Sequence, residues 1–267
     1  PSSLAELYTQ KKQFDRALEL YDRVKNSEMG NDPSLERAIN TTVVRRFEHQ
    51  LEQLNPAAPD YAEQSAKIQK EKLDFQVADC QQRVEKYPTD LAIRFEMGAL
   101  YFQAGKYREA MIEFRNSLQV DPRFPEAHYR LALAYLQLQN AEAAQRELNE
   151  VVTLDPKNVE AQLRLASVLL ARQQFDQAQA AAEKVLASDP KNSRAHAVLA
   201  QRHAADGALD DAVEELQKAI ELDPQAVVNY AALGALHLSA GRRAHNNGPT
   251  APPEPPVADR TAWPFPK

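Results

Sequence analysis

The chain has 267 residues, of which 43% are hydrophobic and 26% are charged, proportions that are ordinary for a globular protein. Its formal net charge of -6 at pH 7 argues against binding to a nucleic-acid backbone, which requires a clustered Lys and Arg surface, so we expect no nucleic-acid partner. Apolar runs fall short of the roughly 18 to 20 residues that cross a bilayer, and the single cysteine, Cys80, permits no internal disulfide, so we expect no direct membrane insertion.

Residues 1–27 carry a helical pattern that is interrupted once. Apolar residues between Ser2 and Lys25 recur at spacings of three, four and seven, and the polar stretch Gln10 to Gln13 divides them. This pattern predicts two short helices that pack as a hairpin.

Residues 33–87 predict two helices that are longer than any later one. Asp32 is expected as the N-cap of the first and Pro33 as its first helical residue. A loop from Asn55 to Asp60 separates it from a second helix that runs up to Pro88. We interpret the pair as a stretched hairpin that caps the rest of the chain; a two-helix coiled coil is the competing interpretation, although the apolar stripes depart from a strict heptad.

A fixed period of 34 residues governs the segment 91–241. It is marked by five evenly spaced prolines, the last four of them preceded by aspartate: Pro88, Pro122, Pro156, Pro190 and Pro224. The period divides the segment into four full repeats and a half repeat: 91–124, 125–158, 159–192, 193–226 and 227–241. Such a period predicts stacked supersecondary units.

Each repeat has a small residue at its eighth position and alanine at its twentieth, as at Gly98 and Ala110, and Asp-Pro at its end. This segment resembles the tetratricopeptide repeat family, and residues 4–24 resemble a degenerate unit of it. The fourth position departs from the family, because tryptophan is absent there. The resemblance implies an all-α fold, an α-solenoid of stacked antiparallel helical hairpins forming a superhelix, with elongated N-terminal helices.

The stretch 242–267 contains seven prolines and no helical stripe. We expect it to be largely disordered, with the proline cluster Pro252 to Pro256 and the segment Trp263 to Phe265 as less favoured docking peptides.

The resemblance also implies a concave groove lined by the first helices of successive repeats. We expect its apolar residues to receive a partner helix or peptide and its arginines to engage carboxylates; the competing interpretation pairs the arginines with Glu126 and Glu160 and packs the aromatic residues on the N-terminal hairpin. The lysine and asparagine with which one branch of the family clamps chaperone C-termini are absent. The expected partner-binding residues are Phe95, Phe102, Tyr129, Arg130, Leu133, Leu136, Leu163, Arg164, Leu170 and Arg194.

Catalytic and metal-binding patterns are weak. His196 and His203 lie two helical turns apart without a carboxylate at ligand spacing, and Cys80 falls in an apolar stripe where a core role is expected. We therefore predict no enzyme activity, no cofactor and no metal.

The function we expect is that of a non-catalytic interaction scaffold or adaptor that binds a peptide or helix of a partner protein. Two alternatives stay open: a structural scaffold that associates with itself through its solenoid ends, and the targeting module of a larger enzyme. We expect a cytoplasmic protein, since no leader opens the sequence. The sequence begins at Pro1 instead of a methionine, so a periplasmic or membrane-tethered protein is the alternative.

Overall fold

The computed structural model describes residues 2–26 and 33–246. They form thirteen α-helices and no strand, packed as consecutive antiparallel pairs, which confirms the all-α, α-solenoid fold class. The chain divides into two compact units, residues 1–156 and 157–267. The expected cap at Asp32 and the two expected docking peptides lie outside the described residues.

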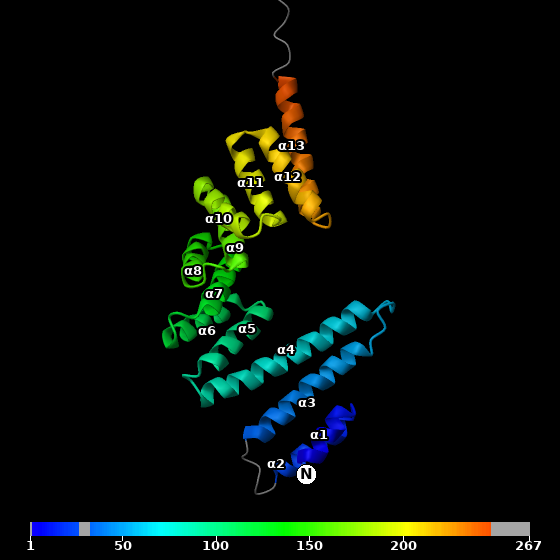
Figure 1. Cartoon of the computed structure of the whole chain (residues 1–267). Helices are drawn as coiled ribbons and strands as arrows, with labels where there is room; N and C mark the ends of the chain where they lie inside the picture. The colour runs from blue at the N-terminus through cyan, green and yellow to red at the C-terminus, as the bar shows by residue number, and fades with distance from the viewer. Residues whose placement is uncertain (1, 27–32, 247–267) are drawn as a thin grey trace, which may run out of the picture. The chain divides into compact units, whose positions relative to one another are not determined.

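The N-terminal unit contains eight helices (Figure 1). Their bounds are α1 Ser2–Gln10, α2 Phe14–Lys25, α3 Pro33–Glu52, α4 Tyr61–Lys86, α5 Leu91–Gln103, α6 Tyr107–Val120, α7 Pro125–Gln137 and α8 Ala141–Leu154.

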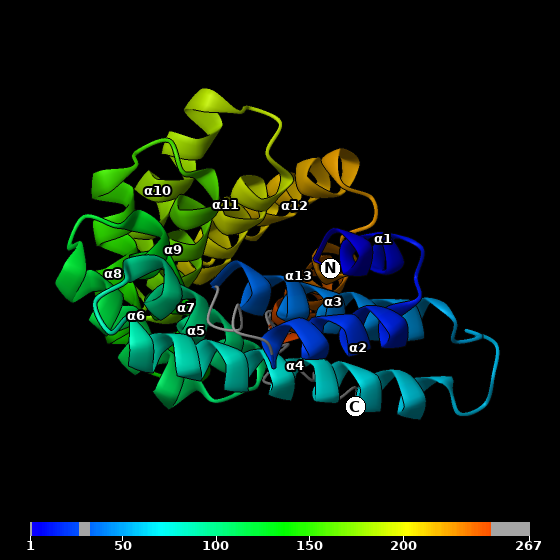
Figure 2. The same ribbon diagram turned by 90° about the horizontal axis from the view of Figure 1, so that it is seen from below.

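The first four helices form two hairpins, α1 with α2 and α3 with α4. Figures 1 and 2 both show α3 and α4 running side by side in opposite directions, with 20 and 26 residues respectively. Ala5, Ala17 and Tyr21 of the first hairpin are buried together with Leu35 of α3, so the short hairpin packs on the long one. A hydrogen bond of 3.0 Å between the hydroxyls of Thr9 and Thr42 joins them in the same buried region.

The regular repeats begin at α5, and their ends follow from local chemistry. The Asp90 side chain accepts a hydrogen bond from the backbone nitrogen of Ile93 and so caps α5. The next helix, α6, ends at Val120 because Pro122 disfavours helical backbone before it. The Asp121 carboxylate accepts a bond from the backbone nitrogen of Arg123 at 2.9 Å, which gives the Asp-Pro pair its role in the turn.

Close packing inside a repeat explains the small residue at the eighth position. A Cβ atom added to Gly98 would lie 2.6 Å from the ring of Phe114, which is fully buried. Because two helices approach this closely, glycine fits between them here, whereas even the Cβ of alanine would require Phe114 to move.

Between residues 157 and 246 the C-terminal unit forms five helices, two further antiparallel pairs and a last single helix. Two of its first helices start at asparagine caps, with Asn158 and Asn192 accepting from the backbone nitrogens of Ala161 and Ala195. The bounds are α9 Val159–Ala171, α10 Phe175–Ser188, α11 Ser193–Asp206, α12 Leu209–Leu222 and α13 Val227–Asn246.

The last helix differs from what the sequence predicted. It continues to Asn246, five residues past Gly241, where we expected the helical pattern to end. Within this helix His237 is exposed and Leu233 is only half-buried. The core residues of the earlier repeats lie between two helices, whereas no second helix of the half repeat lies within the described part of the chain.

A left-handed residue turns the chain between the two helices of every full repeat. It stands at the fifteenth position each time, and two of the four residues are not glycine: Gly105, Gln139, Gln173 and Gly207 have φ of 72°, 58°, 58° and 81°. Glycine adopts this conformation freely, whereas the Cβ atom of glutamine makes it sterically unfavourable.

Candidate functional site

In the N-terminal unit, α5 and α7 carry the expected apolar binding residues in half-buried positions. The ring of Phe95 lies 5.6 Å from that of Phe114 and 5.0 Å from that of Phe124, while Phe102 meets Tyr107 edge-on at 5.2 Å. These rings therefore pack within the repeats, and their remaining surface stays accessible. Tyr129, Leu133 and Leu136 of α7 are also half-buried.

The arginine of this surface is held by its own helix. Nε of Arg130 donates to Glu126 at 2.9 Å, one turn away, and both side chains remain more than two-fifths exposed. An exposed pair of this kind contributes little to stability, so a partner carboxylate can replace Glu126 at small cost.

In the C-terminal unit, one expected binding residue lies in the core instead of on the surface. Leu163 is 2% exposed and packs with Ala166, Val185 and Val198 between the helices. Leu170 is half-buried against the same cluster. The family pattern places position five in the groove. Because Leu163 is buried, however, it packs within the core and has no surface for a partner to contact.

Two arginines of the C-terminal unit share one carboxylate. Arg164 donates to Oε1 of Glu160 at 3.2 Å along α9, and Arg194 of α11 pairs with both oxygens of the same residue from the next repeat. Arg164 is 40% exposed and Arg194 54% exposed. The Nε atom of Arg164 is buried with no hydrogen-bond partner among the described residues. We call Arg164 and Arg194 the arginine pair. Together they place two positive charges beside the single negative charge of Glu160.

The fourth position of the repeats holds a link that sequence reasoning missed. Nδ1 of His128 lies 2.6 Å from Glu147 of the second helix, and Nε2 lies 3.0 Å from the carbonyl oxygen of Pro122, which ends the preceding repeat. Arg94 makes the same two contacts with Glu113 and Pro88, at 2.8 Å each. In the sequence, a polar residue at position four followed by glutamate nineteen residues later could have indicated this link.

His196 in the fourth repeat repeats this arrangement. Its Nδ1 lies 2.7 Å from Glu215 and its Nε2 3.1 Å from the Pro190 carbonyl. Burial, the largest influence, would raise the pKa of Glu215, but hydrogen bonds from His196 and Lys218 together hold this pKa below its usual value of 4.5. Both ring nitrogens of His196 thus contact atoms of the protein itself. Among the described residues no group of three or more His, Cys, Asp or Glu is placed to hold a metal.

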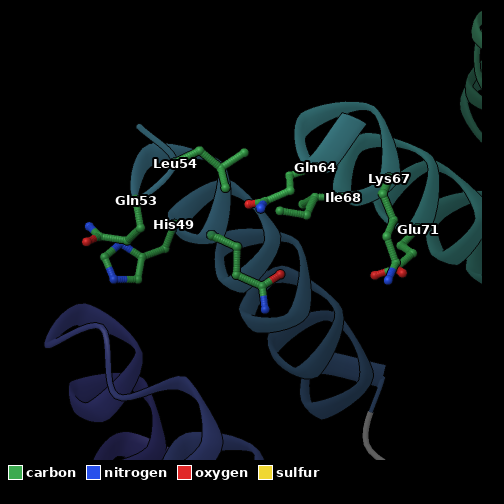
Figure 3. Close-up of a pocket in the computed structure, with 8 residues that line it drawn as sticks. His49, Gln53, Leu54, Gln64, Lys67, Ile68 and Glu71 are labelled. Atoms are coloured by element: carbon green, nitrogen blue, oxygen red, sulfur yellow. The ribbon is translucent and has the colours of Figure 1, made fainter. Parts of the chain in front are cut away.

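A shallow pocket of about 470 Å³ lies between the ends of α3 and α4 where the long hairpin turns. Figure 3 shows Gln64 and Ile68 of α4 pointing across it toward Leu54, with His49 and Gln53 on the opposite wall. Its lining brings together no set of ionisable groups suited to catalysis. Lys67 and Glu71 lie on α4, on the side of the pocket away from His49.

At the other end of the hairpin, Cys80 is fully buried and its sulfur contacts the carbonyl oxygen of Ile93 at 3.6 Å. Burial raises the pKa of its thiol to about 12, which leaves it protonated and unreactive near neutral pH. The neighbouring Asp79 also has its pKa raised by burial, although Arg83 opposes the shift. Within residues 2–26 and 33–246, no helix is sufficiently long and apolar to span a membrane.

Comparison with known protein families finds three overlapping matches in the region of the repeats. Two models described as tetratricopeptide repeat match residues 147–202 and 125–168, and a model described as TPR repeat matches residues 98–139. No curated protein matches the sequence.

Solved structures share the fold at low sequence identity. MamA is 22% identical with a TM-score of 0.55, covering 61% of this chain and 95% of its own. MamA from Desulfovibrio magneticus RS-1, residue 41 to the end, is 24% identical with a TM-score of 0.52, covering 58% of this chain and 89% of its own. YrrB, described as a TPR protein with an unusual peptide-binding site, is 20% identical with a TM-score of 0.56, covering 71% of this chain and 98% of its own. These similarities establish the fold alone.

Proposed function

Because this chain belongs to the tetratricopeptide repeat family, we propose that it is a non-catalytic scaffold that holds a peptide or helix of a partner protein on the first helices of its repeats. The peptide-binding site named for YrrB supports a partner of this class. Each compact unit offers its own part of the binding surface: α5 and α7 in one, α9 and α11 in the other.

The observation that carries the proposal is the arginine pair. Glu160 neutralises one of the two guanidinium groups, so Arg164 and Arg194 leave a net positive charge between adjacent first helices. A planar guanidinium binds a carboxylate through two parallel hydrogen bonds, which suits a partner that presents Asp or Glu. The half-buried apolar side chains Phe102, Tyr129 and Leu133 suit the apolar residues of the same kind of partner.

The test uses peptides selected from a random display library against the purified chain. Binding of a selected peptide is measured by fluorescence anisotropy for the wild type and for the double variant Arg164→Ala with Arg194→Ala. We expect the double variant to bind about tenfold more weakly or worse, with helical circular dichroism unchanged.

Arg146→Ala is the matched control. Arg146 pairs with Glu142 one turn away on α8, as Arg164 pairs with Glu160, but it stands on a second helix and is 70% exposed. Binding should be unaltered in this variant. Selected peptides that bind both variants as tightly as wild type would contradict the proposed surface, as would peptides with no preference for Asp or Glu.

A further inference from the structure

The last helix, α13, exposes an apolar face. Val227 is 76% exposed, Val228 70% and Leu238 66%, values that are high for aliphatic side chains in a packed repeat protein. Ala231, Gly234 and Ala235 are also exposed. At 100° per residue these residues fall on one side of the helix, and together they are called the α13 face.

The complete repeats show what normally covers this face. α13 occupies the place of a first helix. In the third repeat, the residues equivalent to Val227, Ala231, Gly234 and Leu238 pack in one cluster with Ala182 and Val185 of the second helix α10: Val159, Leu163, Ala166 and Leu170. At the eighth position, a Cβ on Gly98 would meet Phe114 at 2.6 Å, whereas a Cβ on Gly234 would meet nothing within 4 Å. The same packing surface is therefore filled in the first repeat and open in the last.

The covering helix has a recognisable pattern in the C-terminal unit. In α10 it consists of Ala178, Ala182 and Val185, each 0% exposed, at steps of four and three residues. α13 carries the same steps with the same kinds of residue, Ala231, Ala235 and Leu238, on its own exposed face. The α13 face thus combines the surface of a first helix with the pattern of a second helix, and it is complementary to itself.

We propose that the α13 face binds the α13 face of a second copy of this chain, with the two helices antiparallel. In that register Ala231 of one copy lies opposite Leu238 of the other, so that a small residue meets a large one, and Gly234 and Ala235 lie at the crossing. A parallel pair would oppose Leu238 to Leu238 and leave a gap between the alanines.

Charge supports the second copy as the occupant. From Val227 to Ala240 the helix has no Asp, Glu, Lys or Arg, so two copies meet without like-charge repulsion. A twofold pair also closes on itself and makes a dimer, not a filament. The pairing goes beyond the scaffold function, because it would bring two partner-binding surfaces into one assembly.

Sedimentation velocity over a wide concentration series tests the pairing. We expect the mass to rise from the 29.9 kDa of one chain to twice that value and no further. Leu238→Glu should weaken the dimer about tenfold or more without loss of helical circular dichroism, because the side chain lies outside the core. Ile112→Glu, at a 52% exposed position on α6, is the matched control and should dimerise like the wild type.

A mixture of Ala231→Cys and Leu238→Cys proteins tests the geometry. The antiparallel register predicts a disulfide between the two variants that forms faster than either variant forms alone, while the buried Cys80 of the wild type forms none. Three results would overturn the proposal: one-chain mass at every concentration, assembly that Leu7→Glu on α1 abolishes and Leu238→Glu does not, or disulfides that form faster within each variant than between them.

Discussion

Nδ1 of His128 lies 2.6 Å from Oε2 of Glu147, and this contact ties the two helices of one repeat to the end of the repeat before it. Both ring nitrogens face acceptors, since the other meets the carbonyl of Pro122. The side chain of His128 is therefore held from two sides, by the second helix of its own repeat and by the end of the repeat before. A polar link therefore stands at position four, where the family resemblance leads one to expect tryptophan.

The third repeat offers a natural control for this link. Its equivalent positions hold Gln162, which is 6% exposed, and Ala181, which carries no carboxylate. We expect Glu147→Ala to lower the free energy of unfolding by about 2 kcal/mol, because the half-buried His128 side chain loses its hydrogen-bond partner on α8. Adding His128→Gln should restore part of that loss. Urea unfolding of the two single variants and the double variant measures the coupling, and strictly additive effects would argue that the contact has no energetic role.

The left-handed turns predict opposite effects at two equivalent positions. Gly105→Ala should destabilise the protein by about 1 kcal/mol through the backbone alone, because an added Cβ meets no atom within 4 Å. Gln139→Gly should be neutral or stabilising, since it removes the steric cost of φ at 58°. Thermal unfolding of both variants checks the pair, and a loss of stability in Gln139→Gly larger than that in Gly105→Ala would contradict the explanation.

The lowered pKa of Glu215 predicts a loss of stability in acid. A carboxylate whose pKa is lower in the folded state contributes stability above its unfolded value of 4.5, and that contribution disappears as the pH falls through the folded value. Glu215→Gln should therefore lose less stability than the wild type when the pH is lowered from neutral to below 4.5. Glu150→Gln, at an exposed position of α8, provides the comparison. Equal acid sensitivity in all three proteins would refute the role of Glu215.

Burial of Cys80 predicts that its thiol reports on opening of the packing between α4 and α5. With its pKa raised to about 12 and no exposed surface, the thiol should react with a disulfide reagent far more slowly than free cysteine. Ile93→Ala, which leaves a cavity beside it, should accelerate labelling, whereas Ile112→Ala on the exposed side of α6 should not. Rapid labelling of the folded wild type would show that this core is open.

The fold was predictable from the sequence because the residues that begin and end its helices act locally and recur in each repeat. The 34-residue spacing of proline indicates where the second helices end, and Asp90, Asn158 and Asn192 cap the first helices through bonds to residues three positions later. The end of α13 was not predictable in the same way, because neither a cap nor a proline marks Gly241.

The candidate site was less predictable, because it depends on which neighbours surround each side chain. Periodicity places Leu163 on a first helix, yet packing against Val185 and Val198 decides that it is buried. Arg130, Arg164 and Arg194 were expected either to bind a partner or to pair within the chain, and the pairs with Glu126 and Glu160 are present. These are exposed pairs that a ligand can displace, so their role in binding stays a prediction.

Photo-crosslinking of a display-selected peptide tests the proposed binding surface most directly. A photoreactive phenylalanine analogue is placed at Phe102 on first helix α5 in one protein and at the exposed Ile112 on second helix α6 in another. We predict a peptide adduct from position 102 that Arg130→Ala diminishes, and none from position 112. An adduct from position 112 without one from position 102 would contradict binding on the first helices.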